Sequence, residues 1–128
     1  MKEYVSWEDV EHFIDSVDEV CSQFDFQFDG VYGVPRGGLV FAVMLSHRMH
    51  LPLLLAPTNK SLIVDDICDS GESLIHYVKN SSSESQNSQK PVIVTMYYKN
   101  NELGVQPDYY LNEKGDNWIV FPWENKED

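Results

Sequence analysis

The sequence has few cysteines, few basic residues and no long apolar run. Its two cysteines, Cys21 and Cys68, are too few for a disulfide framework, and no CxxC pair occurs. Only 9 lysines and arginines stand against 21 aspartates and glutamates, a formal net charge of −12. This charge argues against proteins that coat nucleic acids or bind anionic membranes, because both need a positive field. The longest apolar run, residues 51–57, is far shorter than a membrane span.

The first residues also lack the apolar segment of a secretory signal. We therefore expect a reducing, cytoplasmic location, with no nucleic-acid partner and no membrane insertion. The 128 residues fit a single domain, 1–128, large enough to bury a substantial core. Within it, the polar stretch 81–89 is rich in serine and glutamine and is predicted to be a mobile surface loop.

Hydrophobic periodicity predicts alternating helices and strands. Apolar residues recur at intervals of three and four from Trp7 to Phe24, which predicts an amphipathic helix, and Ser6 with Asp9 resembles a capping box. A second helix is expected over 39–50, and we expect it to be buried because it is apolar nearly all round. Strands are predicted at 28–34, 51–55, 61–64 and 91–98, with weaker candidates at 107–111 and 118–121.

The order of these elements is typical of an α/β domain with a mostly parallel central sheet flanked by helices. In such sheets, ligands bind beyond the carboxyl ends of the strands. Two unusual loops, 35–38 and 66–73, follow predicted strands. We therefore expect both loops to face the same crevice.

The most informative segment is 62–74, in which an apolar strand runs into two adjacent carboxylates, Asp65 and Asp66. A third carboxylate, Asp69, follows in the loop. Carboxylates at a strand end can accept hydrogen bonds from vicinal hydroxyls or hold Mg²⁺. A solvated strand terminus is the alternative interpretation of the acidic pair.

A Ser-Gly-x-Ser turn then leads into a predicted helix. A helix N-terminus binds phosphate, the hydroxyls of Ser70 and Ser73 add donors, and Gly71 allows close approach of the backbone. Phosphate at one end of the loop and a diol with metal at the other match a ribose 5-phosphate. The alternative is a simple capping box formed by Asp69 and Glu72.

Residues 62–74 resemble the 5-phosphoribosyl 1-pyrophosphate (PRPP) signature of the type I phosphoribosyltransferases. Residues 31–40 resemble the pyrophosphate loop of the small bacterial xanthine-guanine phosphoribosyltransferases. Residues 94–99 resemble the strand that carries their purine-contacting lysine, and residues 116–124 their carboxyl-terminal base-binding segment. The matches run in order over most of the chain, and the Trp…Pro-Trp-acid ending favours the purine branch.

This resemblance implies an α/β fold of the type I phosphoribosyltransferase kind and a transfer reaction. A 6-oxopurine base (guanine, xanthine or hypoxanthine) displaces pyrophosphate from PRPP, with Mg²⁺ as cofactor, and a nucleoside 5′-monophosphate is formed. The partners it implies are therefore the small molecules PRPP and a purine base. Members of the family are often dimers or tetramers, so a homodimer or homotetramer is compatible with the resemblance.

The resemblance also implies a role for each matching residue. Asp69 is expected to be the catalytic residue, near N7 of the purine as general base or proton partner. PRPP and its 5′-phosphate are expected to contact Asp65, Asp66, Ser70, Gly71, Glu72 and Ser73. Pyrophosphate is expected at Arg36 and Gly37, in a loop whose Pro35–Arg36 bond is often cis in the family. The base is expected at Lys99, Trp118 and the backbone of Ile119, and the metal at Asp65, Asp66 and Glu124.

Some of these roles have plain structural alternatives. Lys99 is then an exposed lysine at a strand end, Trp118 a packing residue and Glu124 a solvated acid near the chain end. The four histidines have no spacing that suggests a metal site, and we expect them at the surface or at its boundary.

Three departures from the family leave a second function open. Only six residues, 56–61, separate Leu55 from Leu62, too few for the usual mobile lid that keeps water off the reacting ribose. Glu72 places a carboxylate in the phosphate turn, where it would repel a phosphate. The net charge also steers polyanions poorly. The alternative function is a lidless regulatory protein that binds PRPP or a nucleotide with little or no turnover.

Overall fold

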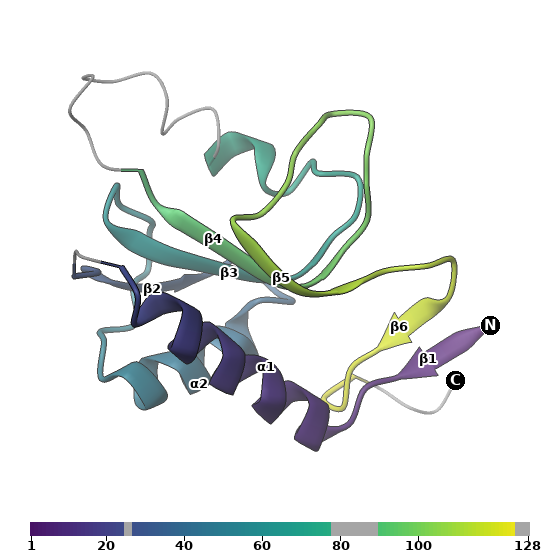
Figure 1. Ribbon diagram of the computed structural model, residues 1–128, viewed down its shortest axis with the longest axis horizontal. Coiled ribbons are helices and arrows are strands. Elements are labelled where there is room, and N and C mark those ends of the chain that lie inside the picture. The colour runs from purple at the N-terminus through teal and green to yellow at the C-terminus, as the bar shows by residue number, and fades with distance from the viewer. Residues whose placement is uncertain (25–26, 78–89, 125–128) are drawn as a thin grey trace.

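The structure is a computed structural model that describes residues 1–24, 27–77 and 90–124. It contains a four-stranded sheet with helices on both faces and a separate two-stranded ribbon (Figure 1). The elements in chain order are β1 (Lys2–Tyr4), α1 (Trp7–Cys21), β2 (Gly30–Gly33), α2 (Leu39–Met49), β3 (Ser61–Cys68), β4 (Val92–Tyr98), β5 (Tyr109–Glu113) and β6 (Trp118–Val120). A helical turn over residues 72–77 follows β3.

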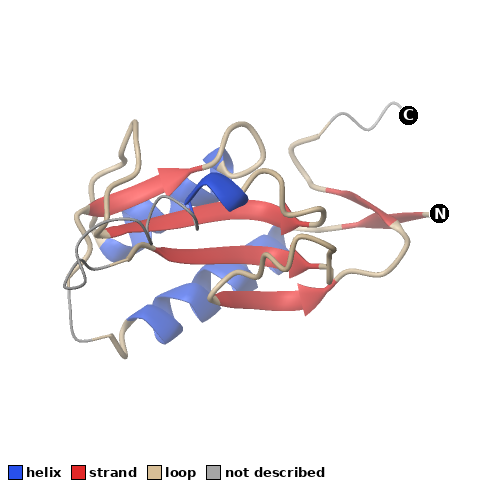
Figure 2. Cartoon of the chain, turned by 90° about the horizontal axis from the view of Figure 1, so that it is seen from above, coloured by secondary structure: helices blue, strands red, loops and turns tan. Residues whose placement is uncertain are grey.

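The main sheet has the order β2-β3-β4-β5, and all of its neighbouring strands are parallel. Its arrowheads point toward the side on which β1 and β6 lie (Figure 2). The central strands β3 and β4 are almost entirely buried, as expected for strands covered on both faces. The predicted fold class, an α/β domain with a mostly parallel sheet flanked by helices, is confirmed.

Helices α1 and α2 cover one face of the sheet, and the helical turn 72–77 covers the other (Figure 1). A chain of edge-to-face aromatic contacts joins the first layer to the ribbon. The ring centroids of Phe13 and Phe41 are 5.2 Å apart, and those of Phe41 and Phe121 are 5.8 Å apart. This packing fixes the position of the segment after β6 relative to α1 and α2.

The predicted first helix is confirmed, with the capping box at its start. The backbone N–H of Asp9 donates to Ser6 Oγ, and that of Ser6 donates to Asp9 Oδ2, both at 3.0 Å. Its core face holds four of the periodic positions, Val10, Ile14, Val17 and Cys21, together with Phe13. Phe24 lies beyond the helix end. No helix in the described parts of the chain combines the length and apolarity needed to cross a membrane.

The second helix is less buried than its composition predicts. Phe41, Ala42 and Leu45 are in the core, but Leu39 and Val43 are 44% and 42% exposed. Only one side of α2 packs on the sheet and α1, which is why an all-round apolar sequence still leaves an exposed face. The expectation of a fully buried helix was therefore wrong.

The strands differ from the prediction mainly in one that does not form, one that is longer and one that was not predicted. The segment 51–55 forms only an isolated bridge, Leu53 to Val31, rather than a strand. Strand β3 continues to Cys68, so Asp65 and Asp66 lie inside it, because β4 pairs with it as far as Tyr98. The short strand β1 was not predicted; its partner β6 is more than a hundred residues away in sequence. The predicted loop 81–89 lies outside the described residues.

Candidate functional site

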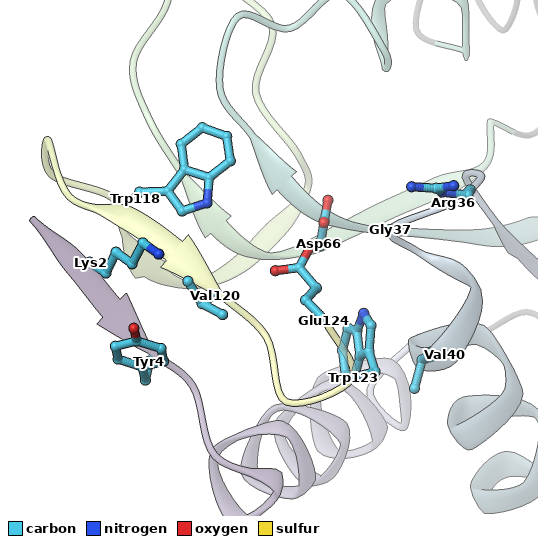
Figure 3. A pocket seen from close by; sticks show the side chains of 10 residues that line it. All are labelled: Lys2, Tyr4, Arg36, Gly37, Val40, Asp66, Trp118, Val120, Trp123 and Glu124. Carbon is cyan, nitrogen blue, oxygen red and sulfur yellow. The ribbon is translucent and has the colours of Figure 1, made fainter. Parts of the chain in front are cut away.

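A cavity of about 750 Å³ lies between the carboxyl end of β3 and the β1–β6 ribbon (Figure 3). Five of the residues predicted to form the site line this cavity: Arg36, Gly37, Asp66, Trp118 and Glu124. They come from segments that are far apart in sequence. The remaining lining residues are Lys2, Tyr4, Val40, Val120 and Trp123.

The two adjacent carboxylates of β3 have different surroundings. Successive side chains of a strand point to opposite faces. Asp66 lines the cavity, whereas Asp65 is 5% exposed. Burial, with a smaller contribution from the charge of Asp66, raises the pKa of Asp65 from 3.8 to about 8. The Asp65 carboxyl group is therefore largely protonated near neutral pH.

The loop between β2 and α2 lies directly against Asp66. A methyl group on Gly37 would overlap the Asp66 carboxylate, so a larger residue there would displace the Asp66 side chain. The backbone is fixed by Val34 N–H to Val64 O (3.0 Å) and Gly38 N–H to Val34 O (2.8 Å). The Pro35–Arg36 peptide bond is cis, as the resemblance implied. The loop 35–38 and Asp66 therefore face one crevice, as predicted, whereas residues 67–73 do not line it.

The predicted phosphate turn does not line this cavity. Gly71 has φ +87°, and a side chain there would meet Val105, so the turn requires glycine. Ser70 Oγ accepts the Glu72 backbone N–H at 3.2 Å, and the Gly71 carbonyl accepts the N–H of Ile75 at 3.0 Å. The side chains of Ser70, Glu72 and Ser73 are exposed. A helical turn thus begins where the sequence predicted it.

Two ion pairs lie at the carboxyl ends of β3, β4 and β5, outside the cavity lining. Lys99 Nζ is 3.6 Å from Asp116 Oδ1. Lys114 Nζ is 3.7 Å from Oδ2 of Asp69, the predicted catalytic residue. Lys99 thus lies at the strand end, as predicted, and forms an ion pair there with a protein carboxylate, that of Asp116. Lys114 did not figure in the sequence prediction.

The predicted base-binding segment forms one wall of the cavity. The indole of Trp118 is 69% exposed, which contradicts core packing as its role. The Ile119 side chain is buried, which leaves only its backbone for a ligand. Glu124 Oε1 accepts the Phe121 backbone N–H at 2.9 Å, and the side chain extends toward Asp66 (Figure 3). Glu124 therefore has a structural contact in addition to facing the cavity.

Sequence reasoning missed the contribution of β1 to this site. Lys2 pairs with Trp118 in the register of the ribbon, and Tyr4 pairs with Val120. The Lys2 side chain points into the cavity (Figure 3). The only local signal for β1 is a stretch of three residues, so its pairing with β6 could not be recognised from periodicity.

Comparison with known proteins gives a consistent picture. No protein-family model matches the chain. A purine phosphoribosyltransferase structure from Pyrococcus horikoshii is 29% identical, with a TM-score of 0.77 over 98% of this chain and 95% of that one. A xanthine-guanine-hypoxanthine phosphoribosyltransferase from Helicobacter pylori is 21% identical, with a TM-score of 0.80 over 96% and 92%. A hypothetical protein from Neisseria gonorrhoeae with bound ppGpp is 17% identical, with a TM-score of 0.75 over 99% and 91%.

The chain has the type I phosphoribosyltransferase fold. The resemblance seen in the sequence is thereby confirmed at the level of the fold. The cavity occupies the place where ligands bind in parallel α/β sheets, beyond the carboxyl ends of the strands.

The connection between α2 and β3 is short and lies away from the cavity. After the bridge at Leu53, the chain turns back at the amino-terminal ends of the strands. Thr58 Oγ1 donates to Asp29 Oδ2 at 3.1 Å, and the Asp29 N–H donates to the Lys60 carbonyl at 2.9 Å. These bonds hold residues 56–61 at the amino-terminal ends of β2 and β3, whereas the cavity lies at the carboxyl ends of the strands. Residues 56–61 therefore do not reach the cavity, which none of them lines.

The residues of this fold suit a magnesium ion that is shared with a substrate. Mg²⁺ usually keeps several waters and is held by one or two carboxylates together with substrate phosphates. Asp66 and Glu124 supply two carboxylates that face one cavity. Within the described ranges, no cluster of three or more metal-binding side chains exists, so an all-protein cage is not formed there.

Proposed function

We propose that the protein is a purine phosphoribosyltransferase that transfers the 5-phosphoribosyl group of PRPP to a 6-oxopurine and releases pyrophosphate. The observation that carries this proposal is the convergence of Arg36, Gly37, Asp66 and Trp118 on one cavity of about 750 Å³. The packing of the fold does not require these groups to meet: an Arg-Gly loop, a carboxylate near the end of β3 and an exposed indole. Together they suit PRPP at one end of the cavity and a flat base at the other.

In this proposal, the guanidinium of Arg36 and the open backbone at Gly37 hold pyrophosphate. Asp66 accepts hydrogen bonds from the ribose hydroxyls, and the turn Ser70–Ser73 holds the 5′-phosphate through hydroxyl and backbone donors. Asp66 and Glu124 would hold Mg²⁺, which would supply positive charge to neutralise the leaving pyrophosphate.

The base occupies the wall formed by β6. Trp118 stacks on the purine, the backbone of Ile119 meets its C2 edge and Lys99 donates to O6. Asp69 accepts the proton that the attacking purine loses as the bond from nitrogen to C1 of the ribose forms and pyrophosphate leaves. Its side chain is half exposed, at 54%, so an incoming ligand can reach it.

A turnover assay tests this proposal. Purified protein, PRPP and Mg²⁺ are mixed with guanine, xanthine, hypoxanthine or adenine, or with no base, and both nucleotide and pyrophosphate are followed. We expect nucleotide with a 6-oxopurine. Asp69→Asn should lower kcat by at least about 100-fold, the usual size of an acid–base contribution, and leave PRPP binding nearly unchanged. Glu11→Gln, at an exposed position of α1, is the matched control.

Equal loss of turnover and PRPP binding in Asp69→Asn would contradict the role given to Asp69. Pyrophosphate released without nucleotide would show that water reaches the ribose in a site without a lid. Absence of both products with every base would contradict the transferase.

A second candidate function is a protein that binds a purine nucleotide or PRPP for regulation. Two observations favour it. The connection 56–61 is held at the amino-terminal ends of β2 and β3 and cannot close over the cavity. In addition, the Neisseria gonorrhoeae protein with the same fold carries bound ppGpp. Binding of PRPP or a nucleotide without any product in the assay above would support this alternative.

A further inference from the structure

Lys114 is a nearly buried cation beside the carboxylate proposed to act on the base. Its Nζ is 3.7 Å from Asp69 Oδ2, and its side chain is only 11% exposed. Lys99, which the family resemblance assigns to the base, is 41% exposed and pairs with the fully exposed Asp116. Of these two lysines, Lys114 is the one whose position is more tightly restricted by its surroundings.

The sheet topology places this pair at the carboxyl ends of the strands. Asp69 follows β3 and Lys114 follows β5, and β4 lies between these strands. The Lys114 backbone N–H donates to the Tyr98 carbonyl, at the end of β4, at 2.8 Å. The Lys114 side chain must therefore cross the carboxyl end of β4 to meet Asp69. Parallel sheets bind ligands beyond the carboxyl ends of their strands.

The pair presents an acceptor and a donor side by side. A carboxylate accepts hydrogen bonds, and an ammonium only donates them, through three protons. Lys114 Nζ donates to the Gly115 carbonyl at 3.3 Å and forms an ion pair with Asp69 at 3.7 Å, which is too long for a hydrogen bond. Protons of the ammonium therefore remain for a ligand. A matching ligand edge has an N–H beside an oxygen, as N7–H and O6 of a 6-oxopurine do. A 6-aminopurine instead presents its amino group, which is a hydrogen-bond donor, to an ammonium that can only donate.

We propose that Lys114 determines the specificity of this site, by pairing with Asp69 to favour a 6-oxopurine over a 6-aminopurine. This proposal rests on the proposed function only in taking a purine or its nucleotide as the ligand. It adds a second cation to the base-binding residues that the family resemblance implies, and it gives Asp69 a partner that fixes the direction of its carboxylate.

Calorimetric titration with GMP and with AMP, both in Mg²⁺, tests the proposal without relying on turnover. We expect the wild-type protein to bind GMP more tightly. Lys114→Met should narrow the ratio of the two Kd values by at least about tenfold, since a hydrogen bond to a charged group is lost. Lys114→Arg should keep most of the preference. Lys60→Met, at an exposed turn just before β3 and far from its carboxyl end, is the matched control.

A measurement on the wild-type protein covers the case in which Lys114→Met fails to fold. The ¹⁵N resonance of the Lys114 ammonium, assigned with Lys114→Arg, should shift on addition of GMP and much less with AMP. An equal shift with both nucleotides, or an unchanged Kd ratio in folded Lys114→Met, would overturn the proposal.

The outcomes separate this proposal from the transferase. If the wild type forms nucleotide from guanine and Lys114→Met keeps the wild-type Kd ratio, only the role of Lys114 fails. If the wild type prefers GMP through Lys114 but forms no nucleotide, only the transferase fails. A protein that binds neither nucleotide overturns both.

Discussion

At the residue scale, the buried Asp65 links stability to pH. Its pKa is raised to about 8 in the folded protein, chiefly by burial. Between about pH 4 and pH 8 the unfolded chain releases this proton while the folded chain keeps it. The contribution of the protonated group to the free energy of unfolding is therefore full below pH 4 and is lost as the pH rises to about 8.

We accordingly expect Asp65→Asn to be more stable than the wild type at pH 8 and to differ little from it at pH 4. The upper bound of the effect is about 1.4 kcal/mol for each pH unit between the two pKa values. Urea unfolding at several pH values measures it, with Glu11→Gln as a control that keeps Asp65. A wild-type slope retained in Asp65→Asn would mean that another group causes the pH dependence.

The sequence indicated some site residues better than others. Arg36, Gly37 and Asp66 belong to local motifs whose spacing carries the chemistry, and the structure brings them to one cavity. Lys2 and Lys114 escaped prediction because each acquires its neighbour through a long-range arrangement of strands. Nothing in their local sequence distinguishes them from ordinary surface lysines.

At the scale of elements too, local signals were predicted well and long-range pairings were not. The helix α1 and strand β4 were predicted well because their periodicity and length are strong local signals. The segment 51–55 reads as a strand by composition, yet side-chain and backbone bonds at Thr58 and Asp29 turn the chain back after one bridge. Conversely, β3 extends past its apolar part because β4 offers it hydrogen-bonding partners.

The phosphate turn 70–73 carries a prediction of its own. Glu72 adds an exposed carboxylate to a turn whose backbone N–H groups and hydroxyls are suited to a phosphate. Removing that negative charge with Glu72→Gln should tighten binding of a nucleoside 5′-monophosphate severalfold at low salt, and the gain should shrink as salt screens the repulsion. Calorimetric titration at two salt concentrations measures both effects.

Glu102→Gln, at another exposed position, controls for the change in net charge alone. If both variants tighten binding equally, the effect belongs to the whole molecule and not to the turn. Unchanged affinity in Glu72→Gln would show that this carboxylate points away from the phosphate.

At the scale of the whole molecule, a net charge of −12 opposes the approach of any phosphorylated ligand. The cations of the site act only at short range, because salt screens charges over about 8 Å at 0.15 M. At about 0.01 M salt the screening length is about 30 Å, so an incoming anion meets the field of the entire surface. The on-rate should therefore depend on salt in the opposite sense from that of a protein that attracts its ligand.

We expect the association rate of a fluorescent guanosine monophosphate to rise between about 0.01 M and about 0.15 M salt at fixed Mg²⁺, since added ions weaken the long-range repulsion. Stopped-flow fluorescence measures this rate, and fluorescent guanosine, which lacks the phosphate, should show little change. A rate that falls with salt would mean that Arg36 and Lys2 dominate the field at the cavity mouth. The acidic surface would then have little influence on how the ligand arrives.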